Sequence, residues 1–222
     1  MIAPVVLAGL ISACAPSVDV RTAAAIVAVE SSGSPYAIND NDMKRAYFPG
    51  SLAAAKALVR RLAGHQLAVG IAQLDSVNFA RLGVDAVTAL DPCTNLRLGA
   101  QVLVEDYQRE YPRASGATEE ERRQSALRRA FSAYNSGSPT AAPAYAALVV
   151  AATSSVLVRA TTAIADAAGG PASRAATRIA PLAAPAPPAA LRVAYAPARA
   201  SSLFIGASSR ISGSAFVFGS SR

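Results

Sequence analysis

The sequence has few of the side chains that bind metal ions or carry redox chemistry. Its 222 residues include one histidine, His65, and two cysteines, Cys14 and Cys93. None of them falls in a Cys–x–x–Cys pattern or in the Cys/His spacing typical of a zinc site. We therefore expect neither a metal ion nor a cofactor.

Long hydrophobic runs are absent as well. No apolar stretch reaches the roughly 18–20 residues that a membrane-spanning helix needs. The apolar segment 1–15 contains no lysine or arginine, whereas a secretory signal normally starts with positive charge. This segment is either a short, atypical export signal or the first helix of the domain. We favour the helix, because Cys14-Ala15-Pro16 runs directly into the next helical segment.

Acidic side chains are scarce in the last third of the chain. Residues 1–152 carry 14 Lys and Arg against 13 Asp and Glu, whereas residues 153–222 carry seven Arg and one acid, Asp166. Nearly all of the net charge of +7 therefore belongs to the C-terminal segment. Such a segment can bind anionic partners. Because its arginines are dispersed, we favour the simpler interpretation that they keep an apolar tail in solution, and we expect no nucleic-acid partner.

The composition favours a helical domain followed by a tail. Hydrophobic residues make up 52% of the chain, and many are alanine, the best helix former. After about residue 153, Ala, Ser, Pro and Gly dominate. We expect one mainly α-helical domain over residues 1–152, a low-complexity and largely disordered tail over 153–222, and a monomer.

Apolar periodicity and capping residues locate the expected helices. They fall at about 18–31, 51–63, 76–82, 92–107, 118–135 and 143–152. Asp91 caps the fourth of these, and Thr118 and Glu121 form a capping box at the fifth. Cys93 shares one face of its helix with an apolar stripe that ends at Tyr107. Residues 34–50 are predicted to be a loop with a short hairpin.

Glu30 is the first candidate for chemistry. It lies near the end of an apolar helix, where burial and the partial negative charge of the helix C-terminus both disfavour the ionised carboxylate. Both effects raise the pKa, which is how a carboxylic acid can donate a proton near neutral pH. A surface glutamate at a frayed helix end explains the spacing alone equally simply.

Two further motifs are weak on their own. Gly70-Ile71-Ala72-Gln73-Leu74 could direct the Gln73 amide into a cleft, and Ala133-Tyr134-Asn135-Ser136-Gly137 places a phenol and an amide at a helix end. A pentapeptide of the first kind occurs by chance, and the second is also an ordinary helix stop.

Together the three motifs resemble the soluble lytic transglycosylase family. Longer strings within residues 12–152 are similar to the transglycosylases of type IV secretion systems. These strings are Cys14-Ala15-Pro16-Ser17-Val18, Ala25-Ile26-Val27-Ala28-Val29-Glu30-Ser31, Pro35-Tyr36-Ala37-Ile38, Val69-Gly70-Ile71-Ala72-Gln73, Asn78-Phe79-Ala80-Arg81 and Asp91-Pro92-Cys93-Thr94-Asn95-Leu96.

The resemblance implies a goose-lysozyme-like α fold with a glycan-binding cleft. It implies that Glu30 is the single catalytic acid/base and that five other residues bind substrate beside it. These are Ser31, Gln73, Tyr134, Asn135 and Tyr145. It also implies a disulfide between Cys14 and Cys93. The alternative at Cys14 is a lipid anchor, since Ile11-Ser12-Ala13-Cys14 is similar to a lipoprotein processing site.

The implied reaction is cleavage of the MurNAc–GlcNAc β-1,4 bond of peptidoglycan, with formation of 1,6-anhydro-MurNAc. It would take place in the periplasm and open the wall for a type IV secretion system, whose channel proteins the tail could contact. Two alternatives remain. One is a muramidase-type hydrolase, in which Asp75, found where the family often has asparagine, activates a water. The other is a non-catalytic assembly factor that binds peptidoglycan.

Overall fold

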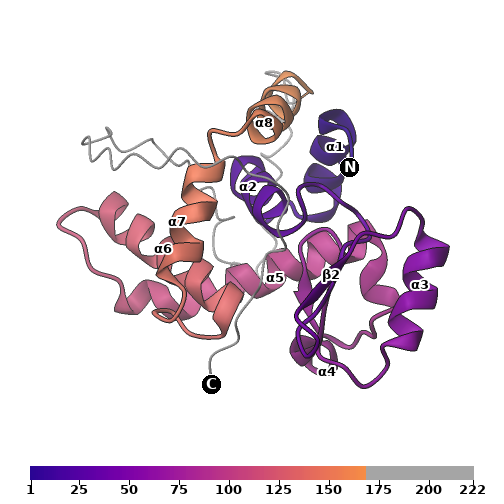
Figure 1. Cartoon of the computed structure of the whole chain (residues 1–222). Coiled ribbons are helices and arrows are strands. Elements are labelled where there is room, and N and C mark those ends of the chain that lie inside the picture. The colour runs from indigo at the N-terminus through magenta and orange to yellow at the C-terminus, as the bar shows by residue number, and fades with distance from the viewer. Residues whose placement is uncertain (169–222) are drawn as a thin grey trace, which may run out of the picture.

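The computed structural model describes residues 1–168 of the chain (Figure 1). The helices are α1 (Pro4–Cys14), α2 (Val20–Ser31), α3 (Leu52–Arg61), α4 (Phe79–Leu82), α5 (Pro92–Glu110), α6 (Glu119–Ser136), α7 (Pro143–Ala152) and α8 (Val156–Ala168). The strands are β1 (Ile38–Asp40), β2 (Arg45–Tyr47), β3 (Leu67–Val69) and β4 (Leu74–Asp75). The expected helices are all present to within a few residues, except that 76–82 is a 3₁₀ turn followed by the short α4.

Helix α5 is the element shared by two hydrophobic cores (Figure 1). One side of it, with Leu96 and Leu103, packs against the helices α1, α2, α6 and α7. Another side, with Leu98 and Val102, packs against α3 and the sheet. A helix buried on two sides cannot show a single apolar stripe. The two cores meet along α5, and both end at the cleft described below.

Helix α2 supplies the centre of the helical core. Asp19 caps it, with a carboxylate oxygen accepting the backbone N–H of Arg21 at 2.9 Å. The helix ends at Ser32, which has a left-handed backbone with φ 51°. Between these ends α2 packs closely against α7 and α8, and its buried residues include Ala23, Ala24, Ala25 and Val27. Glu30 therefore lies in the last turn of a rigid, buried helix.

A small antiparallel sheet forms the other side of the molecule. Its order is β2-β1-β3-β4, and Ile38 of β1 faces Tyr47 on β2 and Val69 on β3. The β1–β2 pair is the hairpin expected within residues 34–50, which is confirmed. The connection from β3 to β4 spans only residues 70–73, and it brings Gln73 next to the end of α2.

The N-terminal segment is the first helix of the fold. Leu7 and Ile11 of α1 are fully buried against the helical core. Cys14, at the end of α1, forms a disulfide with Cys93 in the first turn of α5, with a Cα–Cα distance of 5.3 Å. The disulfide is confirmed, and because it uses the Cys14 thiol, the lipid anchor at this residue is wrong. Cys93 itself is exposed rather than turned inward with the apolar stripe.

The packed body continues past the expected boundary at residue 152. Helix α8 lies beside α1 and α2 (Figure 1), and its Val158 and Thr161 are fully buried. Composition suggested a tail here because Ala, Ser and Thr dominate, but small residues one turn apart also suit close helix packing. The rest of the expected tail, residues 169–222, lies outside the described residues.

Within residues 1–168 no single helix has the length and apolar character needed to cross a membrane. Helices α7 and α8 meet the length and composition criteria only as a pair, and they are bent by 57° relative to one another.

Candidate active site

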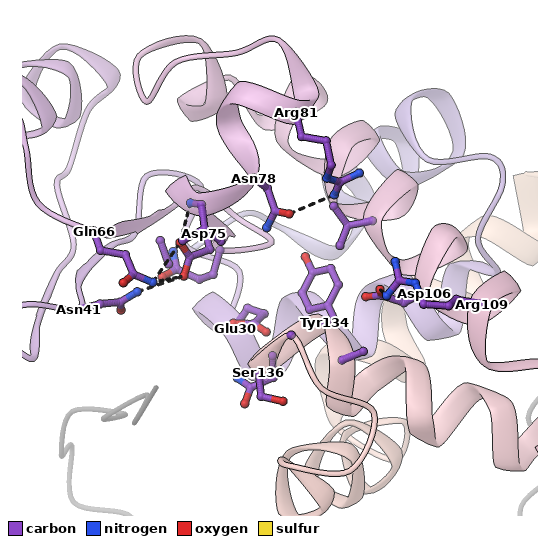
Figure 2. A pocket seen from close by; sticks show the side chains of 17 residues that line it. Glu30, Asn41, Gln66, Asp75, Asn78, Arg81, Asp106, Arg109, Tyr134 and Ser136 are labelled. Carbon is purple, nitrogen blue, oxygen red and sulfur yellow. Dashed lines mark hydrogen bonds and ion pairs between the residues drawn. The ribbon is translucent and has the colours of Figure 1, made fainter. Parts of the chain in front are cut away.

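A cleft of about 370 Å³ lies where the two cores meet (Figure 2). Glu30 and Tyr134 occupy its middle. At one end lie the polar groups of Asn41, Gln66 and Asp75, which come from the sheet and its loops. At the other end lie Arg81, Asp106 and Arg109, from α4 and α5. The cleft therefore has an acidic end and an arginine-bearing end on either side of Glu30.

The Glu30 carboxyl group is held in a poorly solvated position at the wall of the cleft. Its residue is half-buried, and burial raises its pKa from 4.5 to about 8, although a hydrogen bond from Tyr145 lowers it in part. The group is therefore a protonated acid at neutral pH. It can give its proton to a bound ligand and take one back, which is the behaviour expected of a general acid/base.

Tyr145, from α7, is the hydrogen-bond partner of Glu30. The side chain is buried, and its phenol O–H donates to Glu30 Oε1. Burial, together with the nearby Glu30 charge, keeps the pKa of the Tyr145 phenol well above its usual 10, so the phenol stays neutral and remains a donor. The structure thus brings Tyr145 into direct contact with the carboxyl group.

A substitution at Tyr145 has a predictable effect on Glu30. The phenol stabilises the charged carboxylate, so its removal in Tyr145→Phe is expected to raise the Glu30 pKa above 8. Titration of the Glu30 side-chain carbon signal by NMR measures this. Tyr134→Phe is the matched control, because its hydroxyl bonds to a backbone carbonyl instead. An unchanged or lowered Glu30 pKa in Tyr145→Phe would contradict the assigned bond.

Tyr134, from the end of α6, lines the cleft beside Glu30 (Figure 2). Its hydroxyl donates to the carbonyl of Ala72 at 2.7 Å. A Cβ added at Gly99 of α5 would lie 2.9 Å from the same hydroxyl. Only a glycine at that place leaves room for the phenol, so Tyr134 is fixed against the β3–β4 connection, with its ring forming the cleft wall.

Gln73 closes the tight turn between β3 and β4. Its backbone has φ 48°, and its amide nitrogen donates to the carbonyls of Ala37 at 3.0 Å and Gly70 at 2.8 Å. The residue lines the cleft, as expected, although both hydrogen bonds donated by its amide nitrogen go to the backbone. The amide thus secures a left-handed conformation that is rare for residues other than glycine.

Asn95 is a positioning residue that the sequence did not reveal. It is fully buried in α5, accepts the N–H of Ala72 at 2.7 Å, and donates to the carbonyls of Val69 and Ala89 at 2.8 and 2.7 Å. These bonds attach the Gly70–Gln73 turn to α5. Little in the sequence signals this role, because α5 carries several other polar residues and the expected apolar stripe did not include Asn95.

The contact between Gly70 and Asn95 gives a testable prediction. Gly70 has φ 82°, and a Cβ there would lie 2.3 Å from the Asn95 amide nitrogen. Gly70→Ala is therefore expected to lower the free energy of unfolding by at least about 2–3 kcal/mol. Gly83→Ala is the control, with φ 66° but nothing within 4 Å, and should lose only about 1 kcal/mol. Equal losses in denaturant titrations would contradict the close approach.

Ser31 and Asn135, the other expected substrate-binding residues, differ in their surroundings. The Ser31 hydroxyl is buried and donates to the carbonyl of Ile71 at 2.7 Å, so it joins α2 to the β3–β4 connection and does not line the cleft. Asn135 is half-buried and lines the cleft, and within the described part of the chain its side chain makes no hydrogen bond. Its amide is therefore free to bind a ligand.

Asp75 is the other carboxylate on the sheet side of the cleft. It accepts the amide N–H groups of Asn41 and Gln66, each at 3.1 Å, and the backbone N–H of Val77 at 3.0 Å (Figure 2). Three donors hold it in one orientation at the acidic end of the cleft. The sequence alone did not show that Asp75 and Glu30 line the same cleft.

One group of His and Asp side chains lies outside the cleft. One carboxylate oxygen each of Asp40 and Asp42 and a ring nitrogen of His65, which are atoms that could coordinate a metal ion, lie within 4.8 Å of one another. The fold uses all three: Asp40 bonds to His65 at 2.7 Å and to the backbone of Met43, and Asp42 accepts the N–H of Gln66 at 2.9 Å. These bonds attach the hairpin to the loop after α3, which accounts for the cluster without an ion.

Comparisons with known proteins agree with this geometry. A family model described as a transglycosylase SLT domain matches residues 10–146. "Protein virB1" of Agrobacterium fabrum is 41% identical over 126 residues, which are 56% of this chain and 49% of that protein. "Type IV secretion system protein virB1" of Brucella abortus biovar 1 is 37% identical over 147 residues, with 62% of this chain and 60% of that protein covered. "Protein virB1" of Rhizobium radiobacter is 42% identical over 126 residues, covering 56% and 50%.

The chain spans about half to three fifths of the length of the curated relatives it matches. No solved structure matches it. The family match covers more than half of the chain, including every residue that lines the cleft, and the helical architecture confirms the expected mainly α, lysozyme-like fold class. The chain therefore belongs to the transglycosylase SLT domain family.

Proposed function

We propose that the chain is a lytic transglycosylase that cleaves the β-1,4 bond between N-acetylmuramic acid and N-acetylglucosamine in peptidoglycan. The observation that carries the proposal is Glu30, a carboxylic acid with a pKa near 8, in the middle of an elongated polar cleft. The family match and the three virB1 relatives support the same chemistry.

Glu30 acts first as an acid. A glycan strand lying along the cleft places its glycosidic oxygen at the carboxyl group, and Glu30 protonates this oxygen as the bond from the muramyl anomeric carbon breaks. The muramyl N-acetyl group assists at that carbon. Tyr145 then donates its hydrogen bond to the carboxylate that has formed, so the charge developing on Glu30 is partly compensated.

Glu30 acts next as a base. The carboxylate takes the proton from the 6-hydroxyl of the same muramyl ring, and this oxygen forms a new bond to the anomeric carbon, which closes the 1,6-anhydro ring. The proton count balances, because Glu30 ends the cycle protonated. The nucleophile belongs to the substrate, so a high effective concentration replaces a positioned water. One carboxyl group therefore suffices, whereas glycoside hydrolases usually need two.

The surrounding residues have complementary roles in this proposal. Asn135, whose side chain has no hydrogen-bond partner within residues 1–168, and Gln73 bind the sugars, while the Tyr134 ring shapes the wall next to Glu30. Ser31 acts through the fold, because its hydroxyl positions the β3–β4 connection rather than a sugar.

The pKa of Glu30 sets the pH dependence of the reaction. The acid must be protonated before the first step, so kcat/KM is expected to fall as the pH rises through about 8. Rates of muropeptide release from sacculi between pH 3 and 10 measure this limb. Loss of activity centred near the ordinary glutamate value of about 4.3 would show that the acid is another group.

Product mass tests the proposal most directly. Purified protein incubated with sacculi should release muropeptides that end in anhydro-MurNAc and are lighter by one water than hydrolysis products. Hydrolysed ends would instead indicate a muramidase, an outcome for which Asp75, fixed in the same cleft, is the candidate base. Binding to sacculi without any released product would indicate a non-catalytic assembly factor.

The location and partners belong to the same proposal. A peptidoglycan substrate and a Cys14–Cys93 disulfide both suit the periplasm, where such bonds persist. We place the enzyme there as a monomer that opens the wall for a type IV secretion channel, with the part of the 153–222 segment that follows α8 contacting channel proteins. Fractionation of cells and cross-linking to channel subunits test both parts.

A further inference from the structure

The arginine-bearing end of the cleft has no role in the chemistry derived above. Arg81 and Arg109 line the cleft at the end away from Asp75 (Figure 2), and their side chains are 47% and 54% exposed. Sugar rings of the glycan strand are uncharged, so two guanidinium groups are not needed to bind them. Their position in the cleft offers N–H donors that an anionic part of the ligand can use.

Both arginines are fixed in place by carboxylates of α5. Arg81 pairs with Glu105 and donates to Asn78 at 3.0 Å, while Arg109 pairs with the nearly buried Asp106 at 2.8 Å. A guanidinium has five N–H donors, so each keeps donors beyond those used in these bonds. The ion pairs therefore orient the two groups and leave part of each available to a ligand in the cleft.

The distribution of charge along the cleft is asymmetric. Of the charged groups that line the arginine-bearing end, Arg81 and Arg109 are cationic and Asp106 is anionic, whereas Glu105 lies outside the cleft. At the opposite end Asp75 is the charged group. Because the ion pairs with Glu105 and Asp106 balance both guanidinium charges, this end attracts an anionic substituent through its unused N–H donors and not through net charge, whereas Asp75 repels it at the other end. This difference would also fix the direction in which a strand lies.

We propose that Arg81 and Arg109 form a subsite for a carboxylate on the lactyl substituent of a muramic acid residue. The inference rests on the proposed function and names the part of the substrate that this end of the cleft selects. Carboxylates of this substituent come from two sources: the stem peptide, or the lactyl group itself once the peptide has been removed. Arginine suits both, because its planar guanidinium can bind a carboxylate through two N–H groups.

Binding measured without turnover tests the subsite. Glu30→Gln protein is titrated with a neutral N-acetylglucosamine oligomer, with peptide-free glycan strands and with peptide-bearing strands. Adding Arg81→Gln should weaken binding of carboxylate-bearing strands roughly three- to tenfold and leave the neutral oligomer unchanged. A loss with peptide-bearing strands alone identifies the stem peptide as the source, a loss with peptide-free strands alone identifies the lactyl carboxylate, and a loss with both shows that the subsite accepts either carboxylate.

Arg109 needs a different variant, because Arg109→Gln alone would leave the nearly buried Asp106 unpaired. The double variant Arg109→Gln/Asp106→Asn removes both charges and should show the same selective loss. Arg60→Gln, which removes an exposed charge from α3 outside the cleft, is the matched control. The selective loss should shrink at high salt.

Two outcomes would overturn the subsite. Equal weakening of all three ligands would mean that the arginines only shape the cleft, and unchanged binding of every ligand would mean that they do not contact it. Neither outcome bears on the proposed function, which fails separately if protein with Glu30 intact releases no muropeptides from sacculi.

Discussion

Glu30→Gln is expected to lower turnover on sacculi by on the order of 10³-fold or more, because one carboxyl group serves as both acid and base in the proposed cycle. The substitution removes the transferable proton while keeping nearly the same shape. The Tyr145 phenol, which donates to Glu30 Oε1, can donate to the amide oxygen instead. Substrate binding, measured with peptide-bearing glycan strands, should therefore stay close to that of the unchanged protein.

The same variant should be more stable than the unchanged protein at high pH. The folded-state pKa of Glu30 is raised from 4.5 to about 8, so the folded protein binds the proton more tightly than the unfolded chain does. Its stability therefore decreases as the pH rises from about 4.5 to about 8, by at most about 5 kcal/mol. Glu30→Gln should abolish this decrease, which urea titrations at pH 5 and pH 9 measure.

Two results would contradict the role of Glu30. Release of muropeptides by Glu30→Gln at a rate within tenfold of the unchanged protein would exclude it as the acid/base. The same pH dependence of stability in both proteins would show that the pKa of Glu30 is not raised by burial in the folded protein. Asp75→Asn is the matched control, since it also neutralises a carboxylate in the cleft, and it should keep transglycosylase activity if no water has to be activated.

Local sequence patterns were enough to find Glu30 but not to find how it is held. Its place at the end of an apolar helix predicted a raised pKa, and the structure agrees. The resemblance implied that Tyr145 binds substrate but did not predict its bond to Glu30, because α7 is apolar nearly all round and its sequence gives no direction to any one side chain. Long-range contacts of this kind depend on how helices pack.

Asn95 and the arginine-bearing end show the same limit in different ways. Asn95 lies on a second buried side of α5, and a single expected stripe left no reason to bury it. Arg81 and Arg109 belong to α4 and α5, and nothing in their spacing along the chain places them at one end of a cleft. The extension of the fold through α8 was missed because its small residues are also typical of disordered segments.

Loss of the Cys14–Cys93 disulfide is expected to be the largest change in stability that a substitution away from the cleft can produce. The bond joins residues 79 positions apart, and closing a loop of that length restricts the unfolded chain by about 4.5 kcal/mol in the chain-entropy model. It also attaches α1, whose Leu7 and Ile11 are fully buried in the helical core. Without the bond, α1 is held only by that packing.

The double variant Cys14→Ala/Cys93→Ala measures this effect in denaturant titrations, and a loss of about 4 kcal/mol is expected. Because Cys93 is exposed, a reductant can reach the bond, so the unchanged protein should lose a similar amount when reduced, whereas the double variant should not respond. A loss below about 1 kcal/mol in both experiments would mean that burial of Leu7 and Ile11 fixes α1 by itself. The cleft would then depend on the disulfide very little. Its lining residues Val102, Asp106 and Arg109 are held in place by the helix α5 itself, and Cys93 lies only in the first turn of that helix.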